Sequence, residues 1–185
     1  MRIALFTLCL AFVVPAVMAQ PDTAWVRRYD GTDNGWDEAH AIAVDAAGNV
    51  YVTGISNGMG DWDYATVKYG PDGTELWTAV YAGPTGGEDR ARAIAVDDAG
   101  NVHVTGFSEV SNNNRDVLTI KYLPTGDTAW VRTHAVGTGD IGSAIAVDDS
   151  GNVYVAGEAG TYPRIDYVTI KYSPSGDQLW TATYY

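Results

Sequence analysis

The ten residues "DAAGNVYVTG" at positions 45–54 return as "DDAGNVHVTG" at 97–106 and as "DDSGNVYVAG" at 148–157. Four tryptophans keep a similar interval, with 52, 53 and 50 positions between successive members: Trp25, Trp77, Trp130 and Trp180. Self-similarity at such a period is typical of repeat architectures, in which each repeat is one supersecondary unit. The fold therefore follows from the structure of one repeat.

Each repeat contains four short runs of alternating or β-branched residues, which predict strands. In the first repeat these runs are "AIAVD" (41–45), "NVYVTG" (49–54), "YATVKY" (64–69) and "LWTAVY" (76–81). An Asp-x-x-Gly-Asn turn joins the first two runs, and a Pro-x-Gly turn joins the last two. Asp bonds the backbone of its own turn and Gly supplies a positive φ, so both connections are tight hairpins. The repeat is predicted to be a four-stranded antiparallel meander, and the chain to be all-β.

A four-stranded sheet that recurs about every 50 residues is typical of a β-propeller built from four-stranded antiparallel blades. A β-solenoid is the alternative, but its coils are usually much shorter than this unit. Blade units are expected at about 30–81, 82–134 and 135–185, with an extra N-terminal strand at 25–29.

About three blades make an incomplete ring, because propellers use at least about four. The Trp-bearing run occurs four times, whereas each of the other runs occurs three times. Two explanations stay open: the chain is a fragment of a longer product, or another chain completes its ring. Further propeller blades in cis or a second copy in trans are therefore expected partners, since open strand edges and apolar faces invite association.

The first 19 residues have the pattern of a secretory signal peptide, with Arg2 as a basic start, an apolar run from Ile3 to Val14 and small residues before Gln20. That apolar run is too short for a stable membrane span, so no membrane span is expected. A secreted, periplasmic or cell-surface location follows. Cys9 is the only cysteine and would leave with this segment, so no disulfide or cysteine metal site is expected in the mature chain.

Composition and charge narrow the class of partner. Hydrophobic residues make up 46% of the chain and charged residues 18%, which is typical of a chain that folds around a packed core. Without Arg2, 10 basic side chains face 23 acidic ones, so the net charge is −13. An acidic chain repels phosphate backbones and anionic membrane surfaces, so nucleic acid is not an expected partner.

These motifs together carry a family resemblance. The "D-GNVYVTG" turn is followed by "DYATVKY" (63–69) or its relatives "DVLTIKY" (116–122) and "DYVTIKY" (166–172), then by Pro-x-Gly with Trp four residues on. This combination resembles the bacterial beta-propeller repeat called the SBBP repeat, over about residues 30–184. The resemblance implies an exported bacterial propeller of about seven blades, often part of a larger surface protein. It implies no known reaction, so no catalytic residues are carried over.

Three equivalent aspartates stand ahead of the first run of each repeat: Asp37, Asp89 and Asp140. Because this strand usually lines a propeller's central channel, their carboxylates could form an acidic ring that attracts a cation or a basic ligand. The alternative is that each aspartate caps a turn where the chain enters the strand. No Asp-x-Asp calcium loop accompanies them, so no cofactor is expected, with calcium as the one candidate.

Residues that differ between repeats are the better candidates for a site. His40, Arg92 and Ser143 occupy one equivalent position before the first strand, near the same channel mouth. The segments "SNGMGDWD" (56–63), "SEVSNNNRD" (108–116) and "EAGTYPRID" (158–166) are interpreted as variable inter-repeat loops. Their candidates for ligand contact are Trp62, Arg115, Tyr162 and Arg164. Drift in unselected loops explains the same variation.

The sequence favours a ligand-binding or structural module of a larger exported protein, with an unidentified protein or glycan as its ligand. The alternative is an extracellular hydrolase or lyase with an active site at the channel mouth. No Ser/His/Asp arrangement, phosphate-binding glycine loop or His-x-x-x-His pair is present in the sequence. No catalytic residue is assigned, and a non-enzymatic role is preferred.

Overall fold

The computed structural model describes residues 23–31, 35–58, 61–111 and 113–184, so the predicted signal peptide at 1–19 lies outside it. The described residues form twelve strands in three four-stranded sheets, ordered β1-β2-β3-β4, β5-β6-β7-β8 and β9-β10-β11-β12, with every neighbouring pair antiparallel. We call these sheets blades 1, 2 and 3. The strands are β1 (Asp37–Val44), β2 (Val50–Gly58), β3 (Asp61–Tyr69), β4 (Glu75–Tyr81), β5 (Asp89–Val96), β6 (Val102–Ser111), β7 (Asn114–Tyr122), β8 (Thr128–His134), β9 (Ile141–Val147), β10 (Val153–Thr161), β11 (Arg164–Tyr172) and β12 (Gln178–Tyr184).

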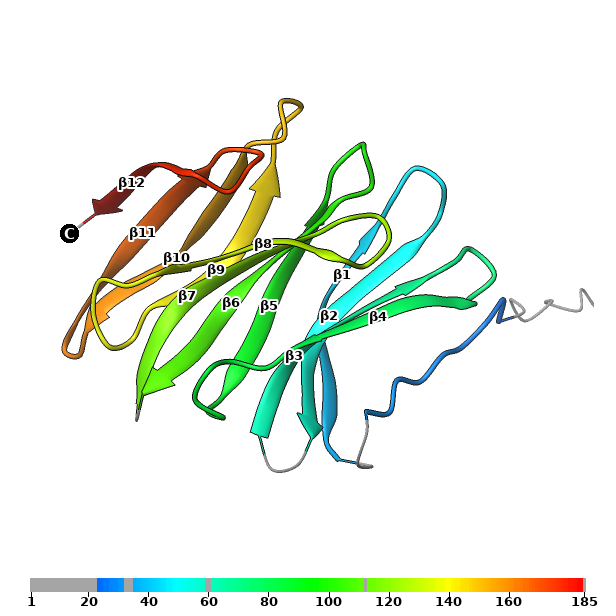
Figure 1. Cartoon of the computed structure of the whole chain (residues 1–185), viewed down its shortest axis with the longest axis horizontal. Coiled ribbons are helices and arrows are strands. Elements are labelled where there is room, and N and C mark those ends of the chain that lie inside the picture. The colour runs from blue at the N-terminus through cyan, green and yellow to red at the C-terminus, as the bar shows by residue number, and fades with distance from the viewer. Residues whose placement is uncertain (1–22, 32–34, 59–60, 112, 185) are drawn as a thin grey trace, which may run out of the picture.

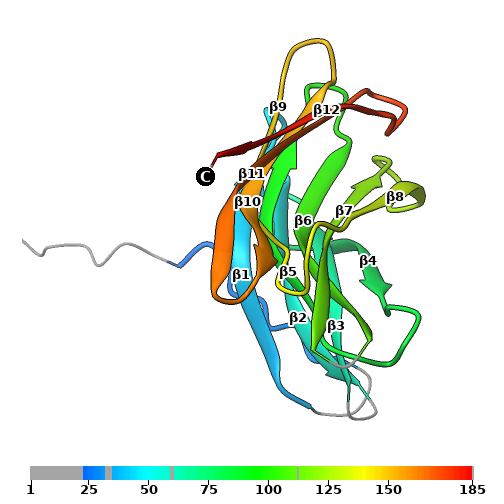
Figure 2. The ribbon, with the colours of Figure 1, turned by 90° about the vertical axis from the view of Figure 1, so that its left-hand side faces the viewer.

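The three blades stand face to face in sequence order (Figure 1). The first strands are neighbours, since β5 contacts β1 on one side and β9 on the other. The fourth strands β4 and β8 lie on the opposite side of the molecule from β1 (Figure 2). This arrangement confirms the predicted all-β architecture of antiparallel blades in an open ring.

The repeated aspartate builds the first hairpin of each blade. In blade 3, Asp148 accepts hydrogen bonds from the backbone amides of Ser150 (3.0 Å) and Asn152 (2.9 Å) and from the Asn152 side chain (2.9 Å). These bonds, led by the one from the Asn152 side chain, lower the pKa of Asp148 below its usual value. Gly151 has a φ of 77°, a conformation that side chains with a Cβ rarely adopt. The recurring Asp and Gly are therefore structural.

The repeated tryptophan joins one blade to the next. Trp130 of β8 donates its indole N–H to the carbonyl oxygen of Pro174 (3.1 Å), in the Pro-x-Gly turn of blade 3. The indole also covers Gly176 of that turn, where an added Cβ would lie 2.8 Å from the ring. Trp77 makes the same contact with blade 2 through Pro124 (3.0 Å). Each Pro-x-Gly turn is thus the receptor for the tryptophan of the preceding blade.

The hydrophobic core lies between blades. The first cluster combines Tyr51 and Tyr64 of blade 1 with one face of blade 2, and the second combines Val117 and Trp130 of blade 2 with one face of blade 3. The buried members of the first cluster are Tyr51, Tyr64, Ala91, Val102, Val104, Leu118, Ile120 and Tyr122. Blade 1 therefore presents an aromatic face to its successor, blade 2 presents Val117 and Trp130, and blades 2 and 3 present mainly aliphatic faces to their predecessors.

His103 replaces the tyrosine that its sister blades have as Tyr51 and Tyr154. Its side chain is fully buried, with Nε2 3.2 Å from the Asp97 carboxylate and no partner for Nδ1 among the described residues. Burial lowers the pKa of His103, more than Asp97 raises it. Because the folded state keeps the imidazole neutral, its contribution to stability is present above the unfolded pKa and is lost as the pH falls below about 6.5.

We predict that the melting temperature of the His103→Tyr variant falls less than that of the wild type when the pH drops from 7.5 to 5.5. Tyrosine places a hydroxyl on Asp97, as Tyr51 does on Asp45 (3.0 Å), and takes up no proton in this range. Melting curves followed by circular dichroism at the two pH values measure the difference. His134→Tyr, which also restores the residue of the sister blades, is the control; an equal decline in wild type and His103→Tyr would contradict the prediction.

We also predict that Trp130→Ala destabilises the fold by about 3–5 kcal/mol, because a large side chain is removed from an interface between blades. The matched control is Trp180→Ala, with an expected cost of about 1 kcal/mol or less. Trp130 is 7% exposed and covered by the next turn, whereas Trp180 is 43% exposed. Urea unfolding curves compare the two variants, and equal costs would refute the role of the turn as receptor.

Candidate functional site

Each first strand contains a β-bulge at an equivalent place. In blade 2 the register with β6 shifts between Ala91 and Ala93, so Arg92 is the extra, unpaired residue. The same shift leaves His40 extra in β1 and Ser143 extra in β9. A bulge interrupts the pairing of a strand and turns the side chain of the extra residue in a new direction. The three positions that differ between repeats are therefore the three bulge residues.

The last glycine of the repeated "GNVYVTG" motif makes the bulge possible. In blade 2, a Cβ at Gly106 would collide with the carbonyl oxygen of Arg90 on the opposite strand. Gly54 faces Glu38 and Gly157 faces Ile141 in the same way. These backbones approach more closely than a side chain permits, so this glycine has a structural reason in every repeat.

The three bulge residues line one shared pocket of about 330 Å³, together with Arg90. His40 Nδ1 lies 2.6 Å from the carbonyl oxygen of Ala91, beside the bulge of the next blade. Because a carbonyl only accepts, Nδ1 carries the proton and donates it, which leaves Nε2 of neutral His40 as an acceptor. The contact also links blade 1 to blade 2. Nε2 has Glu38 as a neighbour at 3.7 Å.

The two arginines of the pocket differ in their partners. Arg90 forms an ion pair with Glu88, which also binds Arg115 (2.6 Å). The guanidinium of Arg90 lies over the ring of Trp62, 5.5 Å from its centroid. Arg92 lies 5.7 Å from the centroid of the Phe107 ring; within the described ranges it donates no hydrogen bond and forms no ion pair. Arg92 is therefore the arginine of the pocket without a carboxylate partner among the described residues.

The predicted acidic ring has a different geometry from the bulge pocket. Asp89 accepts the amide N–H of Gly83 (2.5 Å), and Asp140 accepts those of Val136 (2.5 Å) and Gly160 (2.7 Å). Asp37 accepts that of Gly31 (2.9 Å). These carboxylates bind the loop that enters each blade, and both Asp89 and Asp140 are 0% exposed. Burial raises the pKa of Asp89, against the lowering effect of its hydrogen bonds.

The role of these three aspartates as a ligand or calcium site stays a prediction. Among the residues that the structure describes, no group of three His, Cys, Asp or Glu side chains is close enough to hold a metal ion. The same part of the chain contains no helix long and apolar enough to cross a membrane.

One sequence interpretation is wrong. The three variable segments do not connect repeats, because β2–β3, β6–β7 and β10–β11 are hairpins within single blades. Trp62 and Arg115 lie on third strands and are partly buried, whereas Tyr162 and Arg164 are exposed at the hairpin of blade 3. None of the four lines the bulge pocket, although Trp62 lies under Arg90.

Arg90 was not among the predicted site residues. Its equivalents in the other blades are Glu38 and Ile141, so it too differs between repeats. That difference was the available signal. Strand alternation supports that signal, because residues two apart on a strand share a face, and Arg90 and Arg92 both line the pocket.

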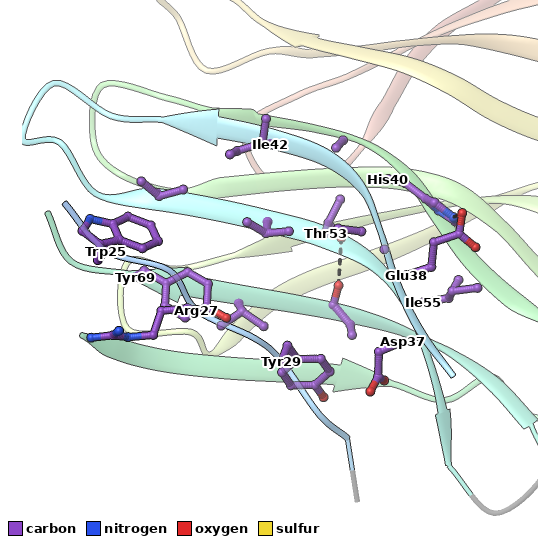
Figure 3. Close-up of a pocket in the computed structure, with 17 residues that line it drawn as sticks. Trp25, Arg27, Tyr29, Asp37, Glu38, His40, Ile42, Thr53, Ile55 and Tyr69 are labelled. Carbon is purple, nitrogen blue, oxygen red and sulfur yellow. Dashed lines mark hydrogen bonds and ion pairs between the residues drawn. The ribbon is translucent and has the colours of Figure 1, made fainter. Parts of the chain in front are cut away.

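A second, larger pocket lies on the open face of blade 1. It has a volume of about 500 Å³ and a floor of aliphatic side chains from β1, β2 and β3. Figure 3 shows the segment with Trp25, Arg27 and Tyr29 running along one side of it. Trp25 donates to Pro71 O (3.0 Å) and Arg27 Nε to Gly73 O (2.7 Å), which repeats the contacts of Trp130 and Arg132 with the turn of blade 3.

Residues 25–29 thus take the place of the fourth strand of a preceding blade. They form no strand in the structure, although one was predicted there. A strand needs a neighbouring edge for its hydrogen bonds, and among the described residues no third strand of a preceding blade lies beside them. Their side chains keep the contacts of a fourth strand without its backbone pairing.

The open face of blade 3 is aromatic. Tyr167 is 72% exposed and Tyr184 is 76% exposed, whereas the equivalent Tyr64 of blade 1 is fully buried against blade 2. Within the described ranges, no Pro-x-Gly turn covers Trp180. The two open faces therefore carry equivalents of side chains that are buried between blades 1 and 2.

Comparison with known proteins agrees with this repeat. The SBBP family, described as a beta-propeller repeat, matches residues 25–60 and 135–162, so the chain contains SBBP beta-propeller repeats. No curated protein matches the chain at a significant level. Among solved structures, a crystal structure of the eukaryotic initiation factor is similar to this chain, with 8% sequence identity and a TM-score of 0.51. The match covers 86% of this chain and 35% of the initiation factor chain. The structure of a fucose lectin from Kordia zhangzhouensis in complex with methyl-fucoside has 10% sequence identity to this chain and a TM-score of 0.46. That match covers 78% of this chain and 97% of the lectin chain.

We predict that Gly106→Ala destabilises the protein by about 1–3 kcal/mol or more, because the new Cβ would collide with backbone at the bulge. Gly139→Ala is the control, since its nearest neighbour would be Ile165 Cδ1 at 3.5 Å, an ordinary contact. The control is expected to change stability by about 0.5 kcal/mol or less. Chemical denaturation measures both, and a neutral Gly106→Ala would contradict the close approach at the bulge.

Proposed function

We propose that this chain is a secreted or cell-surface module that binds a ligand and forms part of a larger β-propeller. The observation that carries the proposal is the match between its two open faces and the internal interface of blades 1 and 2. Ile42 and Val44 on the first open face correspond to Ile94 and Val96, which pack into the core between blades 1 and 2. An apolar face of this size that is left open on a folded protein favours association.

The larger assembly is completed by further blades in cis or by a second copy in trans. The aliphatic face of blade 1 suits an aromatic face such as that of blade 3, because the tyrosines of blade 1 pack on the mainly aliphatic face of blade 2 in this way. A neighbour on blade 1 has to supply only three strands, since residues 25–29 already hold the fourth position. A neighbour that brings its own tryptophan strand competes with Trp25 for the turn at Pro71.

The exported location rests on the sequence pattern of residues 1–19, and the ligand-binding role rests on the bulge pocket. Equivalent residues that recur in every blade serve turns and blade contacts. The bulge residues break this symmetry, which is what a binding site on a repeat scaffold requires. A protein or a glycan is the class of ligand proposed.

The alternative, a hydrolase or lyase at the channel mouth, has one observation in its favour: His40 and Ser143 line the same pocket. In the described structure, however, no hydrogen bond joins them, and Nδ1 of His40 is bound by a backbone carbonyl where a catalytic triad has a carboxylate. We therefore prefer the binding role.

We predict that the mature chain self-associates through its open faces and that Tyr167→Ser combined with Tyr184→Ser weakens association at least about tenfold, as expected for large aromatic side chains at an interface. Light scattering over a range of concentrations measures the mass. Tyr162→Ser is the control, since Tyr162 is 87% exposed but lies at a hairpin outside the open face. A monomer at all concentrations, or equal association of both variants and the wild type, would refute completion in trans by a second copy.

A further inference from the structure

We propose that the bulge pocket binds a monoanionic hydroxy acid, with the uronic acid unit of an acidic glycan as its chemical class. This inference deepens the proposed binding function and rests on it. The pocket contains one arginine without a carboxylate partner in the described structure, one fixed acceptor and one hydroxyl: Arg92, His40 and Ser143. A carboxylate flanked by hydroxyl groups is the ligand that pairs with all three.

The carboxylate is recognised by Arg92. A guanidinium presents five N–H donors in a planar fork that matches a carboxylate in two parallel hydrogen bonds. In the described part of the chain, those donors have no hydrogen-bond partner, and the centroid of the neighbouring Phe107 ring lies 5.7 Å from Arg92 Cζ. Arg92 is exposed on the side of the pocket, so an anion reaches it without prior rearrangement.

The neighbouring hydroxyl groups are recognised by His40 and Ser143. The Ala91 carbonyl holds the proton of His40 on Nδ1, so Nε2 is free to accept a hydrogen bond from an alcohol. Ser143 both donates and accepts through one hydroxyl. A simple fatty acid would leave these groups without partners, whereas a sugar acid has hydroxyl groups beside its carboxylate.

The local charge favours one negative charge over two. Arg90 and Arg115 share the one carboxylate of Glu88, and Glu38 adds a negative charge 3.7 Å from His40. With Arg92, three positive charges thus face two negative ones around the pocket, a net of +1. The chain as a whole has a net charge of −12. A phosphate dianion would bring two negative charges to a pocket with one arginine that lacks a carboxylate partner among the described residues, whereas a monocarboxylate brings one.

The scaffold holds these groups in place before a ligand arrives. Each comes from a different blade, at a bulge that a close backbone contact at Gly54, Gly106 or Gly157 defines. The first strands pack against one another, so the three side chains share one rigid frame. The backbone positions of the three groups are thus set before binding, whereas the exposed Arg92 side chain loses rotamer freedom when it binds.

Nuclear magnetic resonance titration of the labelled mature chain tests the proposal, with sodium galacturonate, galactose and inorganic phosphate as probes. The Nε–Hε signal of Arg92 and the ring signals of His40 are expected to shift with galacturonate, with a Kd on the order of a millimolar. Galactose lacks the carboxylate and is expected to bind at least about tenfold more weakly, because the guanidinium loses its charged partner. Equal binding of galactose, or tighter binding of phosphate, would overturn the proposal.

Two arginine variants separate the site from a general charge effect. Arg92→Ser inserts the residue that blade 3 has at this bulge and is expected to weaken galacturonate binding at least about tenfold. Arg164→Ser removes an exposed arginine from a hairpin outside the pocket and is expected to leave binding unchanged. Arg92→Lys keeps the positive charge but lacks the planar guanidinium, so its affinity for galacturonate is expected to lie between those of the other two variants. Retained affinity in a folded Arg92→Ser variant would refute the site.

Light scattering on the same samples separates this proposal from the proposed function. If the chain associates but galacturonate does not bind, only the ligand class fails. If galacturonate binds to a chain that stays monomeric, completion by a second copy fails and the site stands. Arg92→Ser is expected to leave the association unchanged, because Arg92 lies outside the two open faces.

Discussion

The contact between an indole and a Pro-x-Gly turn organises this molecule. The tryptophan of one blade donates its N–H to a carbonyl of the next turn and covers its glycine. Tryptophan, proline and glycine must therefore recur at a fixed interval, which sets the length of the repeat. The core follows from the same contact, because it brings an aromatic face against an aliphatic one. A blade on its own has no interior; the interior belongs to pairs of blades.

The fold was predictable because its determinants are local. Asp148 and Gly151 define a hairpin whatever lies around them, and alternating residues define the strands beside it. Strand ends were harder, since segments rich in Gly and Asn, such as 108–116, have the composition of linkers although they form hairpins. The site was partly predictable: His40 and Arg92 differ between repeats. Arg90 also differs between repeats and stands two residues before Arg92, whereas the close approach of Gly106 to the Arg90 carbonyl at the bulge is visible only in three dimensions.

The bulges also explain how a repetitive scaffold carries a site that is not repetitive. Turns and blade contacts constrain nearly every recurring residue, including the buried aspartates that bind loop amides. The bulge residue is the exception, because it is unpaired in the sheet and its side chain faces no partner blade core. Substitution there changes the chemistry of the shared pocket. Three blades therefore supply three independent choices of side chain to one pocket.

The position of Trp25 makes the two ends of the module unlike. The turn of blade 1 is occupied by an indole of the same chain, whereas Trp180 at the other end has no turn to bind within the described structure. The turn at the first end is therefore occupied, although both terminal blade faces are open. Any array built from such modules has a direction, and it extends freely from one end only. Adding a blade next to blade 1 requires residues 25–29 either to leave the turn at Pro71 or to pair with the added blade as its fourth strand.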